Sequence, residues 1–225
     1  MSKFAGFPAQ ASEFLGGIEL NNTKEWFEAN REAYKLHLLE PAIAFVSALG
    51  EKLISLDPML SAIPKVNGSL FRINRDIRFS ADKTPYKHHL DVRIWHGEDR
   101  KAGTSSFLFR MYAERLIVGA GIHGFDPKRL ALYRKLIAGP KGEELAKLVA
   151  KLETSGFDVG TEHYKRVPRG YDPEHPRARL LRFNAVHAGL ELPLPPETRS
   201  AKLVTLCMRH YRKLAPLHTW LAANL

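Results

Sequence analysis

Hydrophobic residues in the first quarter of the chain recur at the spacing of helices. The stretch from Pro8 to about Gly17 predicts a short helix that paired glycines end. A second helix is expected from Asn22, a candidate N-cap, to about Leu39, and a third from Pro41 to Leu56. The N-terminal part of the chain is therefore predicted to be helical.

The spacing changes after Asn67-Gly68 to short runs of aromatic and branched residues, which are typical of strands. Ala113-Glu114 is expected to form a tight turn between the last two of these runs. Four strands are predicted, and they cover Leu70 to Phe79, Leu90 to Trp95, Ser106 to Tyr112 and Arg115 to Ile122.

Helical spacing returns after the predicted strands, and Asp126-Pro127 gives a helix-start signal. Further helices are expected over Gly142 to Glu153, Arg177 to Phe183 and Glu197 to Leu221. The order of helices, then strands, then helices favours one α+β domain over residues 1–225. Its mainly antiparallel sheet should lie in the middle of the chain, packed by N- and C-terminal helices.

The chain has 225 residues and a formal net charge of +10, with 34 Lys and Arg against 24 Asp and Glu. Such an excess favours encounter with phosphates and other polyanions, although surface lysines alone also produce it. The single cysteine, Cys207, excludes an internal disulfide and fits a reducing compartment. Since no apolar run approaches the roughly 20 residues of a membrane span, we expect a soluble cytoplasmic protein without a membrane partner.

The candidate chemistry is concentrated in the stretch FRINRDIRFSADKTPYKHH, residues 71–89. If this stretch is extended, Arg72 and Arg78 share a polar face, while Arg75 lies among apolar side chains on the other. An unpaired buried charge costs several kcal/mol, so Arg75 must have a partner. A helical conformation, with Ile73 and Ile77 facing inward, would relieve Arg75 and stays open.

Guanidinium groups bind phosphate or carboxylate with matched geometry, so the stretch predicts an anion site. A second basic block, residues 163–182, would complete the same site or form a solvated loop and helix. The expected ligand is an anionic small molecule or a polyanion, with no cofactor and no metal site. The predicted ligand-binding residues are Arg72, Arg75, Arg78, Lys83, Tyr86, Lys87, Arg169 and Arg179.

Two other classes of function stay open. The first is a phosphoesterase or transferase in which Asp76 or Asp82 acts as general base or metal ligand. A metal held by distant residues, such as Asp76, His123, Asp172 and His175, is a minor alternative. The second is a module that binds nucleic acid non-specifically, with bases stacked on Tyr86, Tyr164 or Tyr171, or an interaction module in which the charges only brace the scaffold.

The run Arg72-x-x-Arg75-Asp76-x-Arg78-Phe79, followed by Asp82-Lys83-x-x-Tyr86, resembles the signature of a family of uncharacterised, mostly bacterial proteins, domain-of-unknown-function family 2461. Asn21-Asn22, Trp26-Phe27 and the block over residues 168–182 are similar to that family's other recurrent segments. The resemblance covers nearly the whole chain. It implies a single full-length domain and marks these residues, but it implies no activity.

Overall fold

The computed structural model describes residues 3–98, 103–160 and 162–225, and its chain divides into two compact units. Unit 1 comprises Met1–Ile94, Leu108–Val118 and Glu191–His210. Unit 2 comprises Trp95–Phe107, Gly119–Leu190 and Tyr211–Leu225. Each unit is thus built from three separate segments of chain. The prediction of a single domain over residues 1–225 is not tested by this division and stays a prediction.

The strands form one mainly antiparallel sheet in the order β1-β2-β3-β4-β6-β5, which confirms the predicted α+β class. The strands predicted over residues 90–95, 106–112 and 115–122 are present almost as expected, whereas β1, β5 and β6 were not predicted. The strands are β1 (Leu60–Ser61), β2 (Leu90–His96), β3 (Ser106–Met111), β4 (Arg115–Ile122), β5 (Asp158–Val159) and β6 (Val186–Pro193).

The N-terminal helices of unit 1 follow one another with short breaks. They are α1 (Ala9–Leu20), α2 (Lys24–Ala29), α3 (Arg31–Ala33), the π-helix η1 (Tyr34–Leu39) and α4 (Glu40–Leu53). The predicted end of the first helix at the paired glycines is wrong, since α1 continues to Leu20. Gly17 instead leaves room for a neighbour: a Cβ there would lie 2.6 Å from Cζ2 of Trp26. The glycine therefore serves helix packing and does not end the helix.

The predicted N-cap of the second helix is wrong by one residue. Thr23 caps α2, since its Oγ1 accepts a hydrogen bond from the backbone N–H of Trp26 at 3.2 Å. Asn22 uses its amide elsewhere, in contacts with Tyr86. The sequence could not separate these roles, because both residue types are good caps.

Aromatic side chains fill the core of unit 1 between its helices and its part of the sheet. Phe45 of α4 lies with its ring centroid 4.7 Å from that of Phe109 in β3, and Phe7 stacks on Phe109 at 6.4 Å. All three rings are buried. The short η2 (Pro196–Arg199) also belongs to this unit, and the backbone N–H of Phe7 donates to the carbonyl of Thr198 at 2.8 Å.

Unit 2 contains α5 (Pro127–Ala138), α6 (Pro140–Thr154), α7 (Ala178–Leu181) and the last part of α8 (Lys202–Asn224). Asp126 caps α5 as expected, since its carboxylate accepts from the backbone N–H of Arg129 at 2.8 Å. Arg177 closes the other end of α5 by donating from Nε to the carbonyl of Ile137 at 2.7 Å. Part of the second basic block therefore completes a helix end.

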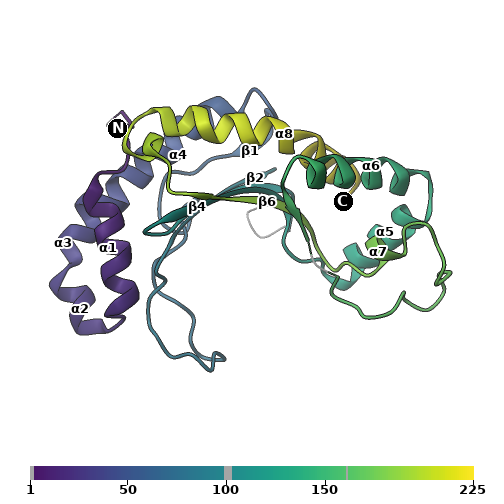
Figure 1. The fold of residues 1–225 in the computed structure, drawn as a ribbon, viewed down its shortest axis with the longest axis horizontal. Coiled ribbons are helices and arrows are strands. Elements are labelled where there is room, and N and C mark those ends of the chain that lie inside the picture. Colours follow the sequence, from purple (N-terminus) through teal and green to yellow (C-terminus); the bar gives the residue numbers. More distant parts are fainter. Residues whose placement is uncertain (1–2, 99–102, 161) are drawn as a thin grey trace. The chain divides into compact units, whose positions relative to one another are not determined.

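The predicted strand from Leu70 to Phe79 is wrong, because residues 71–89 form a long loop of unit 1, drawn in blue-green in Figure 1. We call residues 71–89 the signature loop. Its two limbs pair loosely with each other: Lys87 N–H donates to the carbonyl of Ile73 and Arg75 N–H to that of Pro85, both at 2.8 Å. Asn74 and Tyr86 form an isolated antiparallel bridge between the limbs.

Helices of membrane-spanning length and hydropathy are absent from the part of the chain that the structure describes.

Candidate functional site

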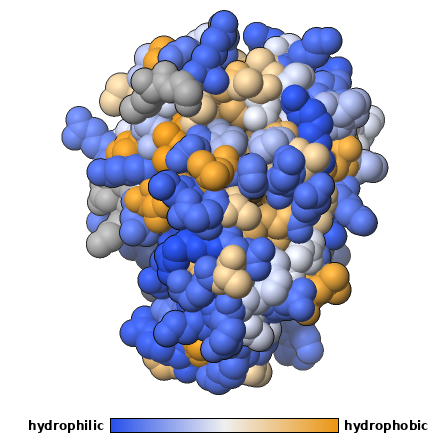
Figure 2. Space-filling model, turned by 90° about the vertical axis from the view of Figure 1, so that its left-hand side faces the viewer, coloured by the Kyte–Doolittle hydropathy of each residue, from blue (hydrophilic) through white to orange (hydrophobic). Residues whose placement is uncertain are grey.

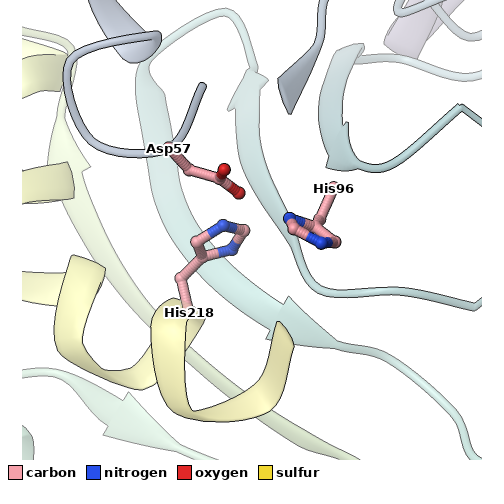
Figure 3. A group of neighbouring side chains, drawn as sticks. All are labelled: Asp57, His96 and His218. Carbon is pink, nitrogen blue, oxygen red and sulfur yellow. The ribbon is translucent and has the colours of Figure 1, made fainter. Parts of the chain in front are cut away.

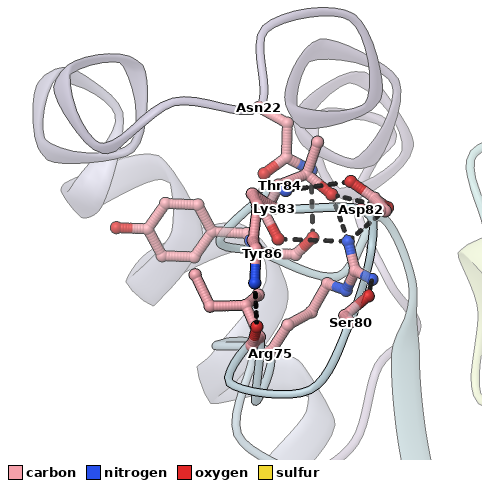
Figure 4. Close-up of polar contacts among 8 residues, drawn as sticks. Asn22, Arg75, Ser80, Asp82, Lys83, Thr84 and Tyr86 are labelled. Atoms are coloured by element: carbon pink, nitrogen blue, oxygen red, sulfur yellow. Dashed lines mark hydrogen bonds and ion pairs between the residues drawn. The ribbon is translucent and has the colours of Figure 1, made fainter.

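Arg75 lies between the two limbs of the signature loop, where it is held by groups of the loop itself. Its Nη1 is 2.5 Å from Oδ2 of Asp82 and also donates to the carbonyl and hydroxyl of Thr84. Its Nη2 donates to Ser80 Oγ at 3.3 Å (Figure 4). The side chain is 26% exposed. The partner that the sequence required for Arg75 is therefore Asp82 of the same loop.

Asp76 and Arg78 form a second ion pair on the exposed side of the loop. Arg78 donates from Nε and Nη2 to the two carboxylate oxygens of Asp76, at 2.9 and 2.7 Å. These bonds from Arg78 lower the pKa of Asp76 to about 2. Bonds from the Thr84 backbone and hydroxyl, with that from Arg75, lower the pKa of Asp82 to about 2. Both arginines are thus paired within the loop.

Lys83 and Tyr86 also hold the loop in place. Lys83 Nζ donates to the carbonyl of Ile77 at 3.0 Å. Tyr86 is bound through its backbone: Asn22 donates to its carbonyl at 2.9 Å and accepts from its N–H at 3.0 Å. Figure 4 shows the Tyr86 ring pointing away from the Arg75 guanidinium. The ring is buried and stacks on Phe27 with centroids 4.3 Å apart.

A pocket of 450 Å³ lies against the signature loop in unit 1. Its volume suits a small ligand, since ligand pockets usually measure roughly 300–1,000 Å³. Both acidic and basic side chains line it, together with two adjacent histidines. The lining residues are Arg75, Asp76, Asp82, Thr84, Tyr86, Lys87, His88 and His89.

A buried carboxylate at the start of β2 lies beside this pocket and was not singled out from the sequence. Asp91 is 5% exposed, and Nε of Arg110 in β3 lies 2.6 Å from its Oδ1. Its Oδ2 is 3.2 Å from Nε2 of His89 and 3.5 Å from Nζ of Lys87. Burial raises the pKa of Asp91, but the bonds from His89 and Arg110 outweigh this effect and lower the pKa to about 2.

The sequence contained a signal for this cluster, because Lys87, His89 and Asp91 alternate along an extended segment and so share one face. Arg110 could not be found in this way, since it comes from another strand. Lys87 is half-buried, and its Nζ lies 4.8 Å from the centroid of the Phe71 ring. Burial lowers the pKa of Lys87; Asp91 raises it in part, and the charges of Arg110 and Arg72 lower it further.

The residues predicted from the second basic block belong to unit 2. Arg179 has its Nη2 2.7 Å from Oε1 of Glu153, and its guanidinium lies 5.5 Å from the ring centroid of Phe183. Arg169 is exposed. Of the other residues predicted to bind the ligand, Arg75, Tyr86 and Lys87 line the pocket of unit 1.

Figure 3 shows a second group of side chains with metal-ligating atoms. Two of them, His96 and His218, belong to unit 2, where their ring centroids are 6.1 Å apart. His218 is buried, and its Nδ1 lies 2.9 Å from Oγ of Ser105. Asp57 belongs to unit 1. Unit 2 by itself thus offers this group two ligands, fewer than the three or four protein ligands of most zinc sites.

The metal set considered from the sequence is divided in the same way. Asp76 belongs to unit 1, whereas His123, Asp172 and His175 belong to unit 2.

Comparison with known proteins gives one family. A family model described as "Conserved hypothetical protein (DUF2461)" matches residues 10–220, nearly the whole chain. No curated protein matches the chain.

Proposed function

The chain belongs to the DUF2461 family of conserved hypothetical proteins, as its sequence predicted, and we propose that unit 1 binds a phosphate-bearing or other anionic ligand at the signature loop. The ligand would occupy the 450 Å³ pocket, with Lys87 and His88 in contact with it and Arg110 behind them. Arg72 is exposed, and its charge lowers the pKa of Lys87. It would attract the ligand to the pocket.

The observation that carries this proposal is the sharing of one carboxylate by two cationic side chains. Lys87 and Arg110 both lie near Asp91, with His89 on the same carboxylate, so within this cluster two positive charges share one negative charge. Burial has removed part of the water around Lys87, which makes its positive form less favourable. An anion in the pocket would supply the missing counter-charge and is therefore the ligand that this wall would favour.

The paired arginines would contribute to the site by shaping it. Arg75 and Arg78 already hold Asp82 and Asp76, so an incoming anion would compete with carboxylates for both guanidinium groups. Their expected role is to fix the loop in the conformation that forms the pocket. Lys83 and Tyr86 would act in the same way, through their bonds to the loop and to Asn22.

The proposal concerns binding, not a named reaction. A general base works best when its pKa lies near the working pH. Asp76 and Asp82, the candidates for this role, have their pKa values lowered to about 2 and would be weak bases at neutral pH. A cytoplasmic location is part of the proposal, because the only cysteine, Cys207, is free and buried, which fits a reducing compartment.

The test is thermal unfolding with inorganic phosphate and a panel of nucleotides at constant ionic strength. A ligand that binds only the folded protein at 100 times its Kd stabilises it by about 2.7 kcal/mol. We expect this gain for the unsubstituted protein and its loss in Lys87→Met, each measured against the same protein without ligand. Lys52→Met, which removes the same charge from the exposed side of α4, should keep the gain. Equal responses of all three proteins would refute the site.

A further inference from the structure

Phe79, at the tip of the signature loop, is 95% exposed. Among the described residues no large hydrophobic side chain is more exposed, and Leu20 at the end of α1 comes next with 85%. Exposing an aromatic ring loses the favourable free energy that its burial would give. Folding alone thus gives no reason for a phenylalanine at this position, where a polar residue would serve.

The tip that carries Phe79 is held in place by several polar contacts. Arg78 and Phe79 occupy a turn in which Ser80 N–H donates to the carbonyl of Ile77 at 3.3 Å. Lys83 donates to the same carbonyl, and Arg75 donates to Ser80 Oγ. These bonds fix the backbone on both sides of the ring. A ring presented in a fixed position can bind a partner with little further loss of conformational entropy.

One cationic side chain lies beside this ring, in a segment with an excess of basic residues. The guanidinium carbon of Arg78 is 5.7 Å from the ring centroid, and four cationic residues face two carboxylates over residues 72–83. Ile77 beside it is only partly exposed. The tip therefore offers one aromatic ring among charged side chains, with little apolar surface around it.

This combination matches single-stranded nucleic acid better than a lipid surface or an apolar protein groove. One base can stack on one ring, while the flanking cations meet phosphates of the strand. Membrane insertion and protein hot spots depend on more contiguous apolar area. On the face that Figure 2 shows, hydrophilic residues predominate, and the hydrophobic ones among the described residues form small separate groups.

We infer that Phe79 stacks on a base of single-stranded DNA or RNA whose phosphates lie along the signature loop. The inference rests on the proposed function, because those phosphates are the anions that Arg72 and Lys87 attract. It adds single-stranded nucleic acid as the class of partner and Phe79 as the residue that stacks on the face of a base. Since every base has such a surface, binding is weakly dependent on sequence.

The experiment compares two fluorescein-labelled oligomers of about 12 nucleotides, a length within the usual site sizes of single-strand binders. One is oligothymidylate, and the other has the same phosphates with abasic tetrahydrofuran sugars. Fluorescence anisotropy at one salt concentration should give roughly 5- to 150-fold tighter binding of oligothymidylate, the ratio expected for one stacked base. Phe79→Ala should lose this ratio without a change for the abasic oligomer, and Phe79→Trp should keep it.

Leu20→Ala is the matched control, since it removes the other highly exposed hydrophobic side chain of unit 1, and it should keep the ratio. Equal binding of the two oligomers, or an unchanged ratio in Phe79→Ala, overturns the inference while leaving the phosphate response of the pocket intact. Absence of binding to both oligomers together with absence of a phosphate response removes the anion site as well. Phe79-dependent binding to phosphatidylserine–phosphatidylcholine vesicles without preference for oligothymidylate also overturns it, in favour of a lipid surface.

Discussion

Arg75 shows that one residue type in one sequence context is compatible with different roles. From the sequence it is a candidate ligand for an anion, and in the structure its guanidinium joins Asp82, Thr84 and Ser80 of its own loop. Arg78, three residues later, pairs with Asp76 on the exposed side. The two arginines differ in how many parts of the loop they connect, and this difference can be measured.

We expect Arg75→Ala to reduce the free energy of unfolding by about 1–2 kcal/mol, because it removes several hydrogen bonds to a charged group that is mostly covered. Arg78→Ala should change it little, since exposed ion pairs contribute little to stability. Chemical denaturation monitored by tryptophan fluorescence compares the two variants, which have the same net charge. Equal destabilisation by both would show that the contacts of Arg75 do not brace the loop.

Two aromatic residues of the signature loop have the opposite environments to those the sequence predicted. Tyr86 was expected to meet a ligand or a base, but its ring is buried against Phe27. Phe79, an aromatic residue that the strand interpretation places on the apolar face with Ile73 and Ile77, is exposed. Residue type alone misleads here because burial is decided by the path of the loop, which depends on contacts with the distant Asn22.

At the scale of elements, the predicted helices and three of the predicted strands were recognisable from periodicity. The strands β1 and β5 have two residues each, which is too short for any period to appear. Residues 70–79 were mistaken for a strand because apolar and polar residues alternate there, and in the structure the exposure alternates too: Arg72, Asn74, Asp76 and Arg78 are exposed, and the residues between them are less so. Alternating exposure of side chains indicates an extended backbone. An extended backbone also occurs in a loop whose two limbs pair only with each other.

The anchor between the N-terminal helices and the signature loop gives a prediction at this scale. Asn22 makes two hydrogen bonds to the backbone of Tyr86, so Asn22→Ala should lower the free energy of unfolding by about 2 kcal/mol, at roughly 1 kcal/mol for each bond. Hydrogen exchange of the Tyr86 amide should become faster. The control is Asn21→Ala, because Asn21 bonds only locally to the carbonyl of Gly17 among the contacts described. Equal exchange rates of the Tyr86 amide in Asn22→Ala and Asn21→Ala would contradict the role of Asn22 as an anchor of the loop.

At the scale of the whole molecule, the two units do not follow one another along the chain. Each unit takes three segments of the chain, and β2, β3, β4 and β6 each run from one unit into the other. A search for linkers in the sequence depends on domains that follow one another along the chain, so it could not find this division. The site could be predicted in part for a related reason: the signature loop is one continuous segment, whereas Arg110 reaches Asp91 from another strand.

Charge is the property of the whole molecule that the sequence does determine, and with Asp91 it predicts a dependence of stability on pH. The pKa of Asp91 falls from 3.8 to about 2 on folding, so its ionised form stabilises the native state. This contribution, about 2 kcal/mol at full strength, is present above pH 4 and is lost as the pH falls toward 2. Protonation of the other carboxylates adds to the +10 charge and increases repulsion within the folded protein.

We therefore expect the free energy of unfolding to fall between pH 4 and pH 2, measured with urea at constant ionic strength. Asp91→Asn should be less stable at pH 7, because Lys87 and Arg110 lose their counter-charge, and its deficit should narrow as the pH falls through that range. Glu19→Gln, an exposed substitution on α1 with the same change in charge, should follow the unsubstituted protein at every pH. A deficit of Asp91→Asn that stays constant from pH 7 to pH 2 would mean that its carboxylate is not what holds these cations.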